Sequence, residues 1–157
     1  IDDVRVITNR STGETAVQLA VAAWLRGADV ELLSGRMSYP VPSFVTKREF
    51  RRVADLLDMV GERDVVIVPA ALSDYAPAPS EGKVSSSLEA LEIKLTPVPL
   101  RARRRLEEHG LDLIVANDLG DVSKGRTKAF ILRPDGSHER YEGTKSGLAD
   151  RILDEVR

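Results

Sequence analysis

The spacing of apolar residues switches between a helical and an extended period along this chain. Between Gly13 and Arg26 apolar side chains recur every three or four positions and Gly27 follows, which predicts a helix. The segments on either side, Val4–Thr8 and Val30–Leu33, have the length of strands, and the first of them is rich in β-branched residues. A strand, a helix and a strand joined by short connections form the unit of a parallel sheet covered by helices.

The same alternation continues toward the C-terminus. Its strongest strand pattern is V-V-I-V at Val65–Val68, a continuous β-branched run. Such runs are buried on both faces in the centre of parallel sheets, so we expect a central strand there. Around it the pattern predicts a short strand near Phe44–Val45, a helix from Val53 to Val60 closing near Gly61, a strand at Glu92–Leu95, a helix at Arg101–His109 and a strand at Leu113–Ala116.

The last part of the chain predicts an antiparallel hairpin followed by a helix. The strands Lys128–Leu132 and Glu139–Tyr141 flank the sequence R-P-D-G, which is a turn signal. The final helix has Thr144 or Ser146 as its cap. We therefore expect an α/β fold with a mostly parallel sheet, helices on its faces and this hairpin at an antiparallel edge.

Length and composition fit one domain over residues 1–157, because 42% of the residues are apolar. A net charge of −2 and a sequence pI near 5.8 argue against nucleic acid or a membrane surface as a partner. The chain starts at Ile1 rather than at a methionine, so we expect it to be a fragment of a longer chain.

Several kinds of chemistry are excluded by residue counts. The absence of cysteine excludes disulfides, thiolate catalysis and cysteine-bound zinc, and two histidines do not make a histidine-rich metal site. No apolar run is long enough to cross a bilayer and no signal peptide is visible, so we expect a cytoplasmic location.

The turn at Asn9–Gly13 is the first candidate site. Its backbone N–H groups and the positive dipole end of the helix that follows would favour an anion, and phosphate is the first hypothesis. The alternative is that Ser11 or Thr12 only caps the helix, and the spacing alone favours the cap.

Further polar side chains follow the carboxyl ends of predicted strands, where open parallel sheets bind their ligands. This inventory contains no Ser-His-Asp arrangement and no activated nucleophile, so it fits nucleotidyl or phosphoryl transfer by positioning and electrostatics. The alternative, which is the more frequent case, is that Lys83 is an ordinary loop lysine and that Asp74 and Tyr75 form a turn. The polar candidates are Arg5, Asn9, Ser11, Asp74, Lys83, Asn117 and Asp118. Gly13 at the helix start, and Ala70 and Ala71 just after a predicted strand, are candidates by their position.

Arg105 and His109 form another candidate pair for phosphate. They lie four positions apart on a predicted helix and therefore share a face. The alternative is a solvated face formed by Arg101–Arg105 with Glu107 and Glu108, and the residues alone favour it.

The segment V-R-V-I-T-N-R-S-T-G at Val4–Gly13 resembles the V-R-x-I-S-N-x-S-S-G signature of phosphopantothenoylcysteine synthetase, the phosphopantothenate–cysteine ligase of coenzyme A biosynthesis. Five more blocks similar to that family follow in the same order and cover most of the chain. They are G-A-D-V-E-L-L-S-G at Gly27–Gly35, A-A-L-S-D-Y at Ala70–Tyr75, Gly82–Lys83, L-D-L-I-V-A-N-D at Leu111–Asp118 and the closing L-A-D-R-I-L-D-E-V.

This resemblance implies a Rossmann-like three-layer fold and a homodimer with its site at the interface between copies. It implies that CTP, or ATP in some branches, with Mg²⁺ activates the carboxylate of 4′-phosphopantothenate as an acyl-nucleotide. The amine of L-cysteine then displaces the mononucleotide. In many family members a flavin-dependent phosphopantothenoylcysteine decarboxylase domain is fused upstream, so it is a possible partner domain here.

The resemblance also implies roles for individual positions, although it assigns no metal ligand. Asn9 would hold the acyl-nucleotide carbonyl, with Arg5 supporting the site, and Lys83 would neutralise charge as pyrophosphate leaves. Ala71 would let the substrate approach the backbone closely. The nucleotide would be bound by Ser11, Gly13, Ala70, Asp74, Lys83, Arg105 and His109.

The chain departs from the family pattern at several places. The glycine-rich strand that precedes the signature is absent, and so is the V-G-F strand expected between Leu100 and Arg101. Glu14 and His109 stand where lysines are customary. These departures bear on nucleotide choice and on the activity of this chain.

Two other functions stay open. One is an NAD(P)-dependent Rossmann oxidoreductase, although no complete G-x-G-x-x-G lies between a strand and a helix. The other is a non-catalytic nucleotide-binding module of a fused protein, which the absence of two strands makes possible.

Overall fold

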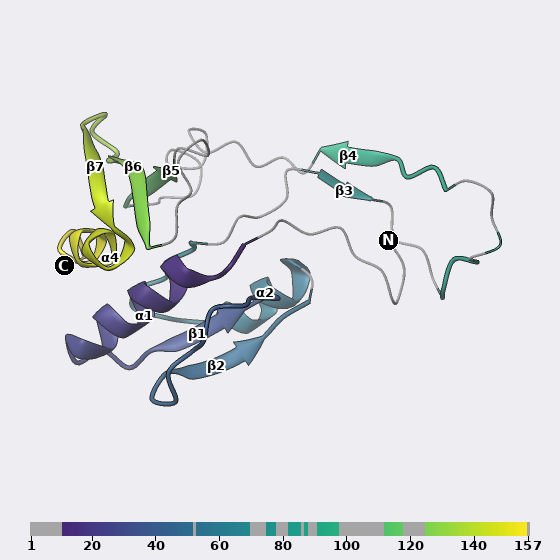
Figure 1. The fold of residues 1–157 in the computed structure, drawn as a ribbon, viewed down its shortest axis with the longest axis horizontal. Coiled ribbons are helices and arrows are strands. Elements are labelled where there is room, and N and C mark those ends of the chain that lie inside the picture. The colour runs from purple at the N-terminus through teal and green to yellow at the C-terminus, as the bar shows by residue number, and fades with distance from the viewer. Residues whose placement is uncertain are drawn as a thin grey trace.

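The computed structural model describes residues 11–51, 53–69, 75–77, 82–85, 87, 91–97, 112–117 and 125–156 (Figure 1). The predicted strand at Val4–Thr8 and the predicted helix at Arg101–His109 lie outside these residues. The helices described are α1 (Glu14–Leu25), α2 (Val53–Val60) and α4 (Lys145–Leu153). The strands described are β1 (Glu31–Ser34), β2 (Thr46–Glu49), β3 (Tyr75–Pro77), β4 (Leu95–Pro97), β5 (Ile114–Asn117), β6 (Arg126–Leu132) and β7 (His138–Thr144).

Helix α1 connects two hydrophobic cores, because it buries apolar side chains on two of its faces. Val17 and Ala20 pack with Leu32 of β1 and with Val45, which precedes β2. The other face packs against β6 and α4, and this core contains Leu19, Ala22, Ala129, Ile131, Leu148, Ala149 and Ile152. The helix was predicted at this place, and its two-sided burial explains why apolar residues surround so much of its circumference.

The N-terminal sheet is the parallel pair β1–β2, with Glu31 opposite Thr46 and Ser34 opposite Glu49. Strand β1 confirms the run predicted at Val30–Leu33 with a shift of one residue. Strand β2 begins just after the short strand predicted at Phe44–Val45, and its four side chains are all exposed. A strand of four exposed polar residues has no apolar alternation by which the sequence could mark it. Helix α2 follows with the predicted bounds.

The C-terminal sheet has the order β5-β6-β7 and is antiparallel throughout. The predicted hairpin β6–β7 is confirmed, and the Gly136 N–H donates to the Arg133 carbonyl across its turn at 3.1 Å. Helix α4 packs on this sheet, and its cap is Thr144, whose hydroxyl accepts from the Gly147 N–H at 3.0 Å. Strand β5 confirms the run predicted at Leu113–Ala116, again shifted by one residue.

The antiparallel pair β3–β4 projects away from both cores (Figure 1). Strand β4 overlaps the strand predicted at Glu92–Leu95 in a single residue, Leu95. Strand β3 was not predicted, because Tyr75–Pro77 is three residues long and ends in proline. The segment between these strands contains Lys83.

The prediction of a central strand at Val65–Val68 is wrong. These residues form no strand, and their exposed fractions are 48, 52, 37 and 57%. Within the described residues β1 pairs with β2 and β5 with β6, and no strand pairs with Val65–Val68. A β-branched run forms a buried strand only when neighbouring strands take its hydrogen bonds and cover its faces.

None of the helices in the described ranges is long and apolar enough to cross a membrane.

Candidate functional site

The turn at Ser11–Gly13 leads directly into α1, as predicted. Gly13 is the N-cap and has φ 80° and ψ 3°, which is the left-handed conformation. A Cβ at this position would lie 2.5 Å from Met37 Cε and 2.9 Å from Met37 Cβ. The N–H groups of Ser38 and Tyr39 donate to the Thr12 carbonyl at 3.2 and 2.8 Å. The turn is therefore pinned against the loop that follows β1.

The two hydroxyls of the turn do not cap α1 in the usual way. The N-cap is Gly13, and no side chain bonds from that position. Instead Thr12 Oγ1 accepts from the Glu14 N–H at 3.3 Å, and Ser11 Oγ accepts from the Gly13 N–H at 3.4 Å. Both contacts are at the long end of the hydrogen-bond range, so an anion arriving at the helix N-terminus competes with weak partners.

Glu14, the first residue of α1, forms a nearly buried ion pair with the first residue of α4. Its Oε2 lies 2.5 Å from Lys145 Nζ, and the two side chains are 10 and 11% exposed. A carboxylate at a helix N-terminus interacts favourably with the helix dipole. Because Lys145 neutralises this carboxylate, a phosphate at the turn does not meet an uncompensated negative charge.

Most predicted site residues lie outside the described residues, and their placement stays a prediction. These are Arg5, Asn9, Ala70, Ala71, Asp74, Arg105, His109 and Asp118. Asn117 ends β5, opposite Ala129 of β6. Lys83 is exposed and lies between β3 and β4, which Figure 1 shows well away from the start of α1. Within the described part of one chain, the β3–β4 pair is thus not brought to the turn.

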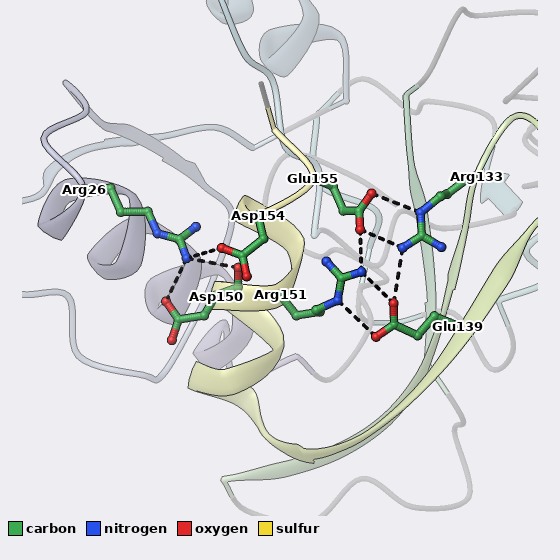
Figure 2. Close-up of polar contacts among 7 residues, drawn as sticks. All are labelled: Arg26, Arg133, Glu139, Asp150, Arg151, Asp154 and Glu155. Carbon is green, nitrogen blue, oxygen red and sulfur yellow. Dashed lines mark hydrogen bonds and ion pairs between the residues drawn. The ribbon is translucent and has the colours of Figure 1, made fainter.

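The structure contains a charged cluster that the sequence analysis missed (Figure 2). Arg133 and Arg151 each bind both Glu139 and Glu155, with nitrogen-to-oxygen distances from 2.5 to 3.2 Å. The two guanidinium groups lower the pKa of Glu155 to about 2 and also lower the pKa of Glu139. The cluster is internally neutral, so it joins the hairpin to α4 and does not attract an anion. Only the pair Arg151 and Glu155 has a spacing that a sequence displays, at i and i+4.

The described residues also form a shallow groove of about 200 Å³ between α1 and α4, whose lining includes Gln18, Ala22 and Ser146. None of the predicted site residues that fall within the described ranges lines it. In the same ranges, no three acidic or histidine side chains gather where they could hold a metal ion.

The arrangement of strands and helices identifies the fold class of the protein. A parallel strand pair beside a helix that starts at a glycine turn, together with a separate antiparallel hairpin, makes this an α/β protein of the Rossmann-like class. Residues 1–100 match the family described as the DNA/pantothenate metabolism flavoprotein C-terminal domain. The chain belongs to this family, which confirms the resemblance found in its motifs.

Two solved structures resemble the whole chain. The C-terminal domain of a coenzyme A biosynthesis bifunctional protein CoaBC is 27% identical with a TM-score of 0.76, and the match covers 99% of this chain and 88% of that one. A DNA/pantothenate metabolism flavoprotein from Streptococcus pneumoniae is 22% identical with a TM-score of 0.80, covering 99 and 92% of the two chains. The second similarity supports the fold alone.

Curated relatives carry the same CoaBC name. The proteins from Vibrio vulnificus (strain YJ016) and Thermococcus kodakarensis are each 29% identical, over 100 and 99% of this chain and 49 and 47% of their own lengths. The chain therefore spans about half the length of the curated relatives it matches. The match to the Vibrio protein extends over 195 residues and this chain has 157, so the chain lacks segments that this relative carries within the matched region.

Proposed function

We propose that this chain is the phosphopantothenate–cysteine ligase domain of coenzyme A biosynthesis. The observation that carries the proposal is the signature V-R-V-I-T-N-R-S-T-G, which leads into the pinned glycine turn at the start of α1. Membership of the flavoprotein C-terminal family and the CoaBC name of the relatives support it. The word bifunctional in those names also supports a fused flavin-dependent decarboxylase as a partner domain.

The proposed reaction has two half-reactions. In the first, a carboxylate oxygen of 4′-phosphopantothenate attacks the α-phosphorus of CTP, and the bond to the β-phosphate breaks, which releases pyrophosphate. In the second, the amine of L-cysteine attacks the acyl carbon, an amide bond forms, cytidine monophosphate leaves and the amine loses a proton. The first step moves negative charge among phosphate oxygens, and the second develops it on the acyl oxygen before it passes to the phosphate of the leaving nucleotide. Positioned cations and N–H groups can therefore stabilise both transition states.

The described turn supports the phosphate-binding part of this reaction. The first N–H groups of a helix have no intrahelical acceptor, and here they follow a turn held by Gly13 and the Thr12 carbonyl. Mg²⁺ would arrive with the triphosphate, since it is commonly held by substrate phosphates, one or two carboxylates and water. Asn9 and Arg5 would hold the acyl group, as the family signature implies.

We test the ligase by measuring which substrates pyrophosphate release requires. Release is expected only when 4′-phosphopantothenate, Mg²⁺ and CTP or ATP are all present, and amide product only when cysteine is added. Parallel assays with CTP and with ATP show which nucleotide the protein uses. Pyrophosphate release without the pantothenate substrate would contradict the proposal.

Lys83→Gln is the sharpest single substitution. Loss of a cation that stabilises the leaving pyrophosphate is expected to slow its release by about 10²- to 10³-fold. Because Lys83 is exposed, the thermal unfolding midpoint should stay that of the unsubstituted protein. Lys47→Gln, at another exposed lysine on β2, serves as the control and should leave the rate unchanged. An unchanged rate in Lys83→Gln would remove this residue from the mechanism.

We also propose that the site is completed by a second copy of the chain. The β3–β4 projection that carries Lys83 lies away from the turn of its own chain (Figure 1). Coexpression of Lys83→Gln with Asn9→Ala tests this arrangement. If the two residues of one site come from different chains, mixed dimers regain one intact site. If both come from one chain, every site in the mixed dimer carries a defect and activity stays absent.

A non-catalytic nucleotide-binding module is the second candidate, and one observation favours it. Val65–Val68 is exposed and forms no strand, so the described residues do not form a continuous parallel sheet with a ligand crevice at its edge. Nucleotide binding by calorimetry without any turnover would support the module and contradict the ligase.

A further inference from the structure

Helices α1 and α4 lie side by side in the same direction, and an ion pair links them at each end. At their starts, Glu14 meets Lys145 in the nearly buried pair described above. At their ends, Arg26 Nη2 lies 2.7 Å from Asp154 Oδ1 and 3.5 Å from Asp150 Oδ1 (Figure 2). The Arg26 side chain is 38% exposed, and the side chains of Asp150 and Asp154 are each 59% exposed. The buried link is therefore at the end of α1 that carries the candidate site.

Lys145 projects from a backbone that is held in several ways. Its N–H donates to the Gly125 carbonyl at 3.1 Å. The preceding Thr144 accepts from the Gly147 N–H through its hydroxyl and from the Tyr141 hydroxyl through its carbonyl, at 3.0 and 2.8 Å. The base of the Lys145 side chain thus belongs to the rigid junction between β7 and α4.

Glu14 transmits this fixed position to the turn. It is the residue after Gly13, and its own N–H contacts the Thr12 hydroxyl. On the opposite side, the loop after β1 binds the Thr12 carbonyl and Met37 packs against Gly13. The turn is therefore held between that loop and α4, which are contributed by distant parts of the sequence.

We propose that Lys145 is a positioning residue for the phosphate-binding turn, acting through Glu14. This inference rests on the proposed nucleotide site at Ser11–Gly13. Removing the ammonium group leaves a carboxylate buried without its partner, and such a carboxylate moves toward water. This movement shifts the first turn of α1, and a displacement of about 1 Å is enough to cost a reaction up to about 100-fold.

The experiment compares Lys145→Met, the conservative Lys145→Arg and the control Arg26→Met. The control removes the exposed link about 18 Å away along α1, estimated from the helical rise per residue. We measure the dissociation constant of CTP and of ATP by calorimetry, the KM values of nucleotide and cysteine, and amide hydrogen exchange in the segment that starts at Ser11.

Lys145→Met is expected to weaken nucleotide binding by about tenfold or more and to leave the KM of cysteine within about twofold. Its exchange near Ser11 should be faster, whereas Lys145→Arg should restore both properties and Arg26→Met should change neither. Should Lys145→Met be too unstable to purify, Glu14→Gln removes the same charge pair from the other side.

Two results would overturn the inference. One is unchanged nucleotide affinity and exchange in Lys145→Met and Glu14→Gln. The other is an equal loss of affinity in Arg26→Met, which would reflect general helix packing. A different result separates the two proposals: if the unsubstituted protein binds neither nucleotide but Lys145→Met exchanges faster at the turn, the proposed function fails and the positioning of the turn stands.

Discussion

At the scale of single residues, Gly13 combines a backbone requirement with a packing requirement. Its φ of 80° favours glycine, and Met37 occupies the space that a Cβ would need. Gly27 has a similar φ of 87°, but a Cβ there would meet nothing within 4 Å. The two glycines at the ends of α1 therefore separate the cost of conformation from the cost of crowding.

We expect Gly13→Ala to lower the free energy of unfolding more than Gly27→Ala. The left-handed conformation costs a residue with a Cβ about 1–2 kcal/mol in both variants. Crowding against Met37 adds about 1–3 kcal/mol in Gly13→Ala alone. Urea denaturation measures both values, and the double variant Gly13→Ala with Met37→Ala should recover part of the difference. Equal destabilisation of the two single variants would contradict the crowding.

Residue identities could be predicted where the chemistry is local. The glycine turn was predicted from the sequence, and the cap of α4 was narrowed to Thr144 or Ser146, because each depends on neighbours within three or four positions. The sequence also shows Glu14 as a departure from the family pattern. Its partner Lys145 lies 131 positions away and was not predictable, because no local spacing relates the two residues.

At the scale of elements, the cluster of Arg133, Arg151, Glu139 and Glu155 joins the β6–β7 hairpin to α4 (Figure 2). The pKa of Glu155 is about 2 in the folded chain and 4.5 without these partners. A carboxylate whose pKa is lowered on folding adds stability above its unfolded pKa, and this contribution disappears as the pH falls through the folded pKa.

We therefore expect the thermal unfolding midpoint to fall as the pH decreases from about 4.5 to about 2, the window between the two pKa values. Glu155→Gln should have a lower midpoint at pH 6 and a shallower decline through this window. Glu142→Gln is the control, because the ion pairs of this carboxylate are long, at 3.9 Å from Lys128 and 3.8 Å from Arg140. Its removal should therefore change the decline with pH less than the removal of the Glu155 carboxylate. Parallel declines in the unsubstituted protein and in Glu155→Gln would contradict a role for this cluster in acid stability.

Element type was predictable wherever an apolar face packs on a neighbour in the described residues. Helices α1, α2 and α4 and strands β1, β5, β6 and β7 all occur within a few residues of their predicted places. Strand β2 was placed only approximately, because its exposed polar residues carry no alternation. Strand β3 depends on pairing with β4 rather than on its own sequence.

At the scale of the whole molecule, Val65–Val68 stands out because four consecutive β-branched residues are exposed. An exposed apolar segment of this kind is a template for association with other chains. The charged residues Glu62, Arg63 and Asp64 before it and Pro69 after it limit how far such pairing can extend.

Val66→Lys is expected to reduce self-association without lowering the unfolding midpoint, because this side chain is 52% exposed. Static light scattering over a concentration series measures the effect. Val156→Lys changes an apolar residue that is 39% exposed outside this run, and single exposed residues rarely drive association. If both variants scatter alike, the run has no special role in association.

The sequence by itself determined the α/β class, the family and the glycine turn that opens α1, because each depends on local spacing and on motifs that are contiguous in the chain. Only the tertiary structure decided that Val65–Val68 stays outside a sheet, that Glu14 pairs with Lys145 and that the β3–β4 pair lies away from the turn in one chain. A strand needs neighbours and a buried charge needs a partner, and these are supplied by segments far apart in sequence whose proximity no local pattern encodes.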